Sequence, residues 1–263
     1  MSPTPIASSA SATVYDNYGT DIPPHPGGNW TRFVCISDTH SRVYPVPPGD
    51  VLLHAGDLSS WGTVEQLQLT VDWLMSLEHP TKVAIAGNHD LCLDRKWIDL
   101  PRRYKHGTGI CGEDVVRARE MLSSEAMRRA GFYFLEHQSI EFDTAAGRRW
   151  KVYGSPATPF FVHGAFQYSG AEEGEAIHAR IPPDTEILLT HTPPHLTLDQ
   201  ARRGVNAGCP YLAARVAALR ACRLHVFGHI HEAHGAVLHE GGRVSVNAAL
   251  PSGGQAIIVD LRN

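Results

Sequence analysis

The chain has 263 residues, a formal net charge of −4 and 19% charged side chains of both signs. This length suits one layered α/β domain better than two full domains. The charges form no basic stripe that would neutralise a nucleic-acid backbone, so we expect no nucleic-acid polymer as a partner. No apolar run reaches the ~18 residues of a membrane-spanning helix, and the N-terminus lacks a signal-peptide pattern. We therefore expect a cytoplasmic protein without a membrane partner.

Residues 1–29 differ in composition from the rest of the chain. They are rich in Ser, Thr, Pro and Gly and contain few large apolar side chains. Such a segment buries too little apolar surface to offset the entropy of ordering it. We therefore predict a flexible N-terminal arm over residues 1–29, which Val14 and Tyr15 could pin locally, and a single domain over residues 30–263.

Apolar runs bounded by turn residues begin at Arg32 and alternate with helical patterns. The runs predict buried strands at residues 33–37, 51–56, 82–87, 150–154, 186–191 and 224–229. Helical patterns cover residues 64–74 and 114–130, and a third begins at Pro210. The tail indicates a hairpin around Gly241 and Gly242 followed by a last strand at residues 256–261. This order predicts an α/β sandwich of two mixed β-sheets flanked by helices.

Potential metal ligands stand at the ends of five predicted strands. These ends read Asp38-Thr39-His40, Gly56-Asp57, Gly87-Asn88-His89-Asp90, His191 and Gly228-His229-Ile230-His231. Ligands bind at the C-terminal edges of strands in open α/β sheets, so the five segments can converge although they are far apart in the sequence. Asp and His side chains favour divalent ions such as Mn, Fe or Zn over a metal selected by thiolates.

The motifs D-x-H, G-D, G-N-H-D, a single His and G-H-x-H follow one another in this order, and together they resemble the signature of the calcineurin-like metallophosphoesterases. The resemblance covers about residues 33–260. Longer strings, among them SDTHS at 37–41, YGSPATPFF at 153–161 and LHVFGHIHEAHG at 224–235, resemble the metallophosphoesterase-domain-containing phosphodiesterases. The resemblance implies an αββα sandwich and a centre of two divalent ions, Mn, Fe, Zn or Mg, with Mn expected in vitro.

The resemblance also implies a role for each motif residue. It assigns Asp38, His40 and His231 to one metal, Asn88, His191 and His229 to the other, and Asp57 to both as a bridge. Two such cations lower the pKa of a bridging water and clamp the oxygens of an in-line displacement. We expect the hydroxide to attack phosphorus while Asn88 holds a phosphoryl oxygen and His89 protonates the leaving oxygen. Asp90 is expected to orient His89 through its ring N–H.

Gly208 and Cys209, directly before the helix at Pro210, are further candidates for substrate binding beside Asn88 and His89. Backbone N–H groups at a helix start can bind a phosphate, although a plain helix start has the same sequence. In the resembled phosphodiesterases a Gly-Cys pair at this place lies toward the nucleotide pocket. Relatives commonly carry an aromatic residue at the position of Ala157, so base stacking stays an open question.

Taken together, these observations predict metal-dependent hydrolysis of phosphate esters, chiefly phosphodiesters and among them cyclic nucleotides. The expected partner is a small phosphate ester or a nucleotide. A phosphomonoesterase or protein phosphatase would share the motifs, but it would need a groove that admits its substrate. A nucleotide-binding scaffold with low turnover would also keep the fold, and the intact ligand set argues against it. Native metal and oligomeric state stay open.

Overall fold

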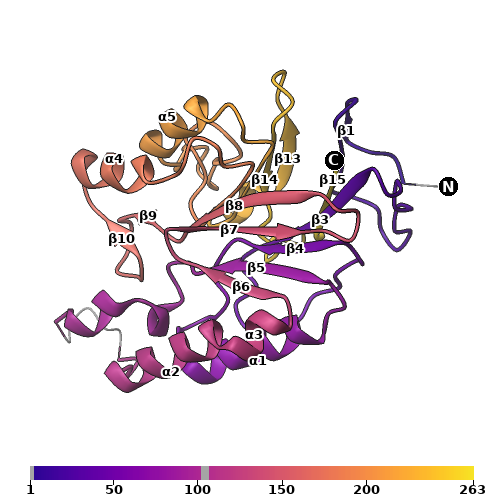
Figure 1. The fold of residues 1–263 in the computed structure, drawn as a ribbon. Helices are drawn as coiled ribbons and strands as arrows, with labels where there is room; N and C mark the ends of the chain where they lie inside the picture. Colours follow the sequence, from indigo (N-terminus) through magenta and orange to yellow (C-terminus); the bar gives the residue numbers. More distant parts are fainter. Residues whose placement is uncertain (1–2, 102–106) are drawn as a thin grey trace.

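The computed structural model describes residues 3–101 and 107–263. Two mixed β-sheets pack face to face, and helices cover the outer face of each sheet (Figure 1). This confirms the predicted α/β sandwich. None of the described helices is both long and apolar enough to cross a membrane.

The first sheet has seven strands, in which β3 to β6 run parallel and β15 lies antiparallel between β2 and β3. The apolar runs of β3 to β6 bury one side chain in the core between the sheets and the next under the helices, so these four strands have no solvent-facing side. In spatial order the strands are β1 (Ala7–Ser8), β2 (Ala12–Tyr15), β15 (Ile257–Arg262), β3 (Trp30–Ile36), β4 (Val51–His54), β5 (Thr81–Ile85) and β6 (Phe132–Leu135).

The second sheet has six strands, with four parallel strands between two antiparallel edge strands. In spatial order they are β13 (Gly235–Leu238), β14 (Val244–Asn247), β12 (Leu224–Phe227), β11 (Ile187–Thr190), β8 (Arg149–Ser155) and β7 (Gln138–Asp143). A short pair, β9 (Thr158–Pro159) and β10 (Gln167–Tyr168), follows β8. The parallel strands of each sheet end at a common edge.

Two helical layers enclose the sheets. The first sheet is covered by α1 (Val64–Ser76), α2 (Gly112–Ser123), α3 (Glu125–Arg129) and the short 3-10 turns η1 (Leu91–Leu93) and η2 (Arg95–Asp99). The second is covered by α4 (Ala171–Ala179) and α5 (Pro210–Ala218), and η4 (His231–Ala233) lies in the loop after β12. The single helix predicted over residues 114–130 is two helices, because the Ser124 side chain caps a new helix at the Met127 N–H.

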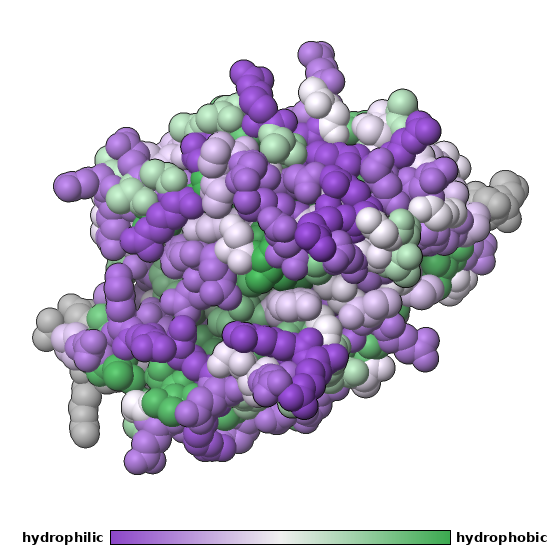
Figure 2. All heavy atoms as spheres, viewed as in Figure 1, coloured by the Kyte–Doolittle hydropathy of each residue, from purple (hydrophilic) through white to green (hydrophobic). Residues whose placement is uncertain are grey.

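Hydrophobic side chains fill the space between the sheets, where the Phe33 and Trp150 rings meet edge to face with centroids 5.3 Å apart. On the face shown in Figure 2, hydrophilic residues predominate, and hydrophobic residues show mainly in the hollow between its upper and lower halves. This distribution is the usual one for a protein with an aqueous surface and an apolar interior.

The N-terminal segment differs from the predicted flexible arm. Residues 12–15 form β2, which pairs with β15, and Ala12 and Val14 are fully buried in the core. Further along, the Tyr18 hydroxyl donates to the Ala256 carbonyl at 2.7 Å. The prediction of flexibility is wrong here because two small apolar side chains and a ladder to the last strand are enough to order the segment.

Candidate metal centre

Aspartate and histidine side chains from five segments converge at the C-terminal edge of the two sheets. Their potential donor atoms form three overlapping groups, and within each group all atoms lie within 4.8 Å of one another. The groups are Asp38, His40 and His231; His40, Asp57 and His89; and Asp38, Asp57 and His191. The convergence follows from the topology, because β3, β4, β5, β11 and β12 all end at this edge.

Imidazole nitrogens of the cluster lie close to carboxylate oxygens and to one another. His231 Nε2 lies 3.1 Å from Asp38 Oδ1 and 3.4 Å from His40 Nε2. His191 Nε2 lies 3.4 Å from Asp57 Oδ1, and His40 Nε2 lies 3.9 Å from Asp57 Oδ2. These contacts place Asp38 beside His231, and Asp57 between His40 and His191.

Asn88 and His229 complete the set of predicted ligands. Asn88 Oδ1 lies 2.9 Å from His191 Nε2. The His229 N–H donates to both oxygens of Asp38, at 3.1 and 3.0 Å, and its ring centroid lies 5.0 Å from that of His191. All seven side chains predicted to bind metal are thus in one cluster, and their assignment to individual ions stays a prediction.

The backbone is strained at four of these residues. Asp38, His40, Asp57 and His229 have φ angles of 57°, 48°, 54° and 68°. The left-handed region costs a non-glycine residue roughly 1 kcal/mol or more and is found mainly at sites where function requires it. Here it turns the chain sharply after β3, β4 and β12 and so aims these side chains at a common point.

Two glycines allow the carboxylates to lie directly against the backbone. A Cβ on Gly228 would be 2.0 Å from Asp38 Oδ2, and a Cβ on Gly87 would be 2.3 Å from Asp57 Oδ1. No other residue fits at either position without displacing a carboxylate.

The charges of the cluster suit divalent cations. Burial alone would raise the pKa of Asp38 and of Asp57. Neighbouring histidines outweigh it and hold both pKa values below the usual value: His231 does so for Asp38 through a hydrogen bond, and His191 does so for Asp57. Among the described residues, the partners of these two carboxylates are histidines and backbone N–H groups, with no Lys or Arg ion pair. Two buried carboxylates without a permanent cation fit a centre of divalent metal ions.

Burial also sets the protonation of the histidines. It lowers the pKa of His229 to about 4, so this ring is neutral near pH 7, the form that binds metal ions. For His191 burial acts in the same direction, but Asp57 outweighs it and raises the pKa to about 9. A cation placed between Asp57 and His191 would take over the role of that proton.

A backbone carbonyl, rather than Asp90, orients His89. His89 Nδ1 lies 2.7 Å from the Ser60 carbonyl oxygen, and the His89 N–H donates to Asp57 Oδ1 at 2.8 Å. The buried Asp90 carboxylate accepts from the N–H groups of Leu58, Ser59 and Gly87 and from the Ser59 hydroxyl. The prediction that Asp90 orients His89 is therefore wrong, and Asp90 instead ties the loop after β4 to the loop after β5.

The backbone N–H groups of Gly208 and Cys209 already have partners in the protein. The Gly208 N–H donates to Asp199 Oδ2 at 3.0 Å, and the Cys209 N–H donates to the Pro193 carbonyl at 2.9 Å. Cys209 is fully buried, and its Sγ accepts from the Leu212 N–H at the start of α5. Substrate binding by this pair stays a prediction, and it would have to use other atoms than these N–H groups.

Residues without a sequence motif also support the centre. The buried His54 Nε2 lies 2.9 Å from the Thr39 hydroxyl, between Asp38 and His40. His137 Nδ1 lies 3.2 Å from Ser155 Oγ, and the Ser155 carbonyl accepts from the His191 N–H. The position of His54 at the end of an apolar run was the one sequence signal for these contacts.

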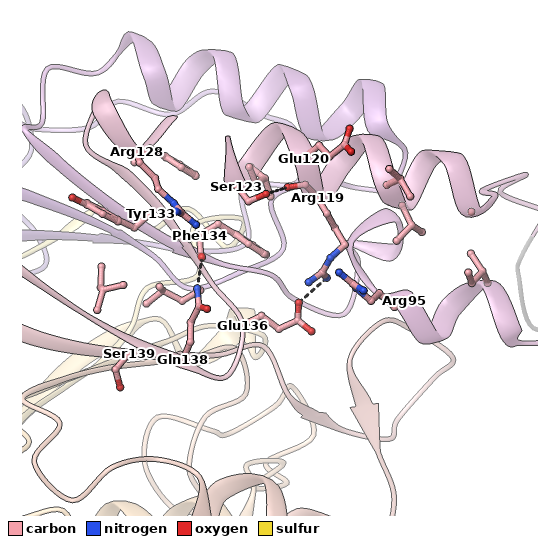
Figure 3. Close-up of a pocket in the computed structure, with 18 residues that line it drawn as sticks. Arg95, Arg119, Glu120, Ser123, Arg128, Tyr133, Phe134, Glu136, Gln138 and Ser139 are labelled. Carbon is pink, nitrogen blue, oxygen red and sulfur yellow. Dashed lines mark hydrogen bonds and ion pairs between the residues drawn. The ribbon is translucent and has the colours of Figure 1, made fainter. Parts of the chain in front are cut away.

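A separate groove of about 990 Å³ lies beside the edge strands β6 and β7 and under α2 (Figure 3). Arg119 and Glu136 form an ion pair of 2.6 Å in it, and the Gln138 side chain donates to the Phe134 carbonyl. None of the candidate metal ligands lines this groove.

Comparisons with known proteins agree with this geometry. The family model for calcineurin-like phosphoesterases matches residues 31–233. Human metallophosphoesterase domain-containing protein 1 is 34% identical over an alignment of 241 residues, and the alignment covers 88% of this chain and 68% of that protein. A probable rhamnogalacturonate lyase C of Emericella nidulans is 37% identical over 228 residues, 86% of this chain, and the match spans only 20% of that protein's length.

One solved structure supports the fold. The protein TT1561 of Thermus thermophilus superposes with a TM-score of 0.53 at 12% identity, covering 82% of this chain and 88% of its own.

Proposed function

Because the chain belongs to the calcineurin-like phosphoesterase family, whose chemistry is phosphoester hydrolysis, we propose that it is a phosphodiesterase acting on small phosphodiesters, cyclic nucleotides among them. The observation that carries the proposal is the cluster at the common strand edge, in which two buried carboxylates are surrounded by imidazoles and lack a Lys or Arg partner among the described residues. The intact donor set favours catalysis over binding alone.

In this proposal Asp38, His40 and His231 would hold one divalent ion, Asn88, His191 and His229 would hold the other, and Asp57, which lies near both His40 and His191, would serve both. When bound, such a pair of ions supplies a nucleophilic water at neutral pH and neutralises the phosphoryl oxygens.

The protein itself contributes proton transfer and orientation. With Nδ1 of His89 donating to the Ser60 carbonyl, Nε2 is the nitrogen that can give a proton to the departing oxygen when the ring is protonated. Asn88 Oδ1 lies 2.9 Å from His191 Nε2 and would face the ion that both residues hold, so the amide N–H₂ of Asn88 is the group that can donate to a phosphoryl oxygen.

The test is metal-dependent hydrolysis of bis(p-nitrophenyl) phosphate, p-nitrophenyl phosphate and 2′,3′-cyclic AMP, after chelation and after Mn²⁺ is added back. We expect the diesters to be turned over faster than the monoester, and only with metal. His229→Ala should lower diester turnover by more than about 100-fold, because loss of even an outer partner of a metal ligand costs 10- to 100-fold.

His239→Ala is the matched control, since His239 bonds Ser245 on the distant hairpin. Faster hydrolysis of the monoester would replace the proposal by a phosphomonoesterase. Bound Mn²⁺ without turnover of any of the three esters would replace it by a nucleotide-binding scaffold.

A further inference from the structure

Large apolar side chains are exposed on two loops that adjoin the candidate metal centre. Trp61 is 67% exposed, and the consecutive residues Phe160, Phe161 and Val162 are 51%, 79% and 55% exposed. Single exposed apolar residues are common, but three in a row are costly in water unless they serve binding.

The first of these loops carries Trp61 and contacts the centre at His89. Ser60, the residue before Trp61, is held by two hydrogen bonds. Its carbonyl accepts from His89, and its hydroxyl donates to the His40 carbonyl at 2.6 Å. The Trp61 N–H donates to the Gln66 side chain at 2.7 Å, which holds the backbone of Trp61 in place.

The second loop carries residues 160–162 and contacts the centre at Asn88 through its last residues. The Ala165 N–H donates to the Asn88 carbonyl at 2.8 Å, and a Cβ on Gly164 would lie 2.8 Å from the same oxygen. Consecutive Cα atoms are about 3.8 Å apart, so Phe161 lies within about 11 Å of Gly164 along the chain. The other end of the loop is closed by the Phe160 N–H, which donates to the Tyr168 carbonyl.

We propose that Trp61 and residues 160–162, here called the aromatic rim, bind the organic substituent of the substrate and select phosphodiesters that carry an aromatic group. The inference rests on the proposed phosphodiesterase activity and adds the class of substituent. One loop contacts His89 and the other contacts Asn88, so a substituent on a phosphoryl group held by these two residues can extend over either loop. A flat ring there stacks on Trp or Phe and leaves water, whereas a methyl group gains little.

The position of Ala157 agrees with this assignment. Ala157 is only 2% exposed and carries no ring, so it cannot stack on a substrate. The exposed rings next to the centre belong to Trp61 and to residues 160–161.

The experiment compares methyl p-nitrophenyl phosphate with phenyl p-nitrophenyl phosphate. Both lose p-nitrophenolate, so they differ only in the substituent that stays on phosphorus. We expect the phenyl-to-methyl ratio of kcat/KM to fall roughly fivefold to tenfold in Trp61→Ala or Phe161→Ala, mainly through KM. Leu69→Ala is the control, because Leu69 is 61% exposed on α1 and should keep the wild-type ratio. A ratio within twofold of wild type in both rim variants would overturn the proposal.

A binding measurement separates this inference from the proposed activity. Calorimetry of the Mn²⁺-loaded protein with phenylphosphonate and methylphosphonate gives the phenyl-to-methyl ratio of affinities without any turnover. If no diester is hydrolysed, a phenyl preference that falls in the rim variants still supports the rim, and an equal affinity for both phosphonates overturns it. If Phe161→Ala keeps the wild-type phenyl-to-methyl ratio of affinities but loses binding to phosphatidylcholine vesicles, the substrate-binding role of the aromatic rim is also overturned, in favour of a membrane contact.

Discussion

Gly228 shows how closely the candidate centre is packed at the scale of one residue. Asp38 lies against its backbone, and the next residue, His229, donates its N–H to the same carboxylate. The position of Asp38 is therefore set by the absence of a side chain as much as by the groups that bond it.

We expect Gly228→Ala to weaken Mn²⁺ binding by at least about tenfold and to lower the free energy of unfolding of the metal-free protein by about 1–3 kcal/mol, because the new methyl group overlaps Asp38 and Ser37. Calorimetry with Mn²⁺ and urea unfolding in chelator measure the two effects. Gly241→Ala should change neither, since a Cβ there has no heavy atom within 4 Å. Wild-type affinity in Gly228→Ala would contradict the packing argument.

The sequence is sufficient to predict which strand-end residues come together, because each of them directly follows a buried apolar run. It cannot predict what orients them. The partner of His89 is the carbonyl of Ser60, and any residue type offers the same carbonyl. That contact depends on how the loops after β4 and β5 fold against each other.

At the scale of elements, β2 supplies the largest difference between expectation and structure. Its partner β15 is more than 240 residues away in the chain, and although Val14 and Tyr15 are apolar enough to pin the segment, nothing in the local sequence identifies that partner. The strand is buried on one face only, with Ala12 and Val14 inside and Thr13 half-buried on the other face.

We expect Val14→Ala to lower the free energy of unfolding by about 1–3 kcal/mol, because it deletes two methyl groups from a fully buried site. Thr13→Ala should change it by no more than about 0.5 kcal/mol. Urea unfolding of both variants measures the difference. Equal stabilities would mean that the segment behaves as the flexible arm expected from its composition.

The predicted strands share apolar runs, and two of the missed elements, β7 and α4, lack them. In β7 only Ile140 and Phe142 are apolar, because the strand lies at the edge of its sheet. In α4 the buried positions are Gly174 and His178, so no apolar stripe marks the helix. Apolar runs therefore identify the strands in the middle of each sheet and the hairpin at one edge, but not β7 or α4, and the apolar edge strand β6 was also missed.

Buried histidines affect the molecule as a whole. Burial lowers the pKa of His178 to about 4, and its Nε2 lies 3.1 Å from the Tyr168 hydroxyl and 3.5 Å from Cys209 Sγ. Burial also lowers the pKa of His79 to about 4, with Lys82 acting in the same direction. Each ring is neutral when folded at a pH where it is charged when unfolded.

Because the folded-state pKa lies below the unfolded value of 6.5, the stabilisation is complete above pH 6.5 and is lost as the pH falls toward 4. For His178 we expect a loss of about 2 kcal/mol between pH 7.5 and 5.0. Urea unfolding in chelator at pH 7.5 and 5.0 should therefore show a smaller pH effect in His178→Gln than in wild type, by about that amount. The same pH effect in both proteins would exclude His178 as a source of acid sensitivity.

The place of β15 between β2 and β3 also governs when the protein can fold during its synthesis. β3, which leads directly to Asp38, gains its second neighbour only when residues 257–262 have been made and have left the ribosome. Until then the nascent chain carries an unpaired β3 edge, which is open to association with other chains. A nascent chain that ends before residue 257 would therefore carry every candidate ligand but lack the strand that completes the sheet beneath them.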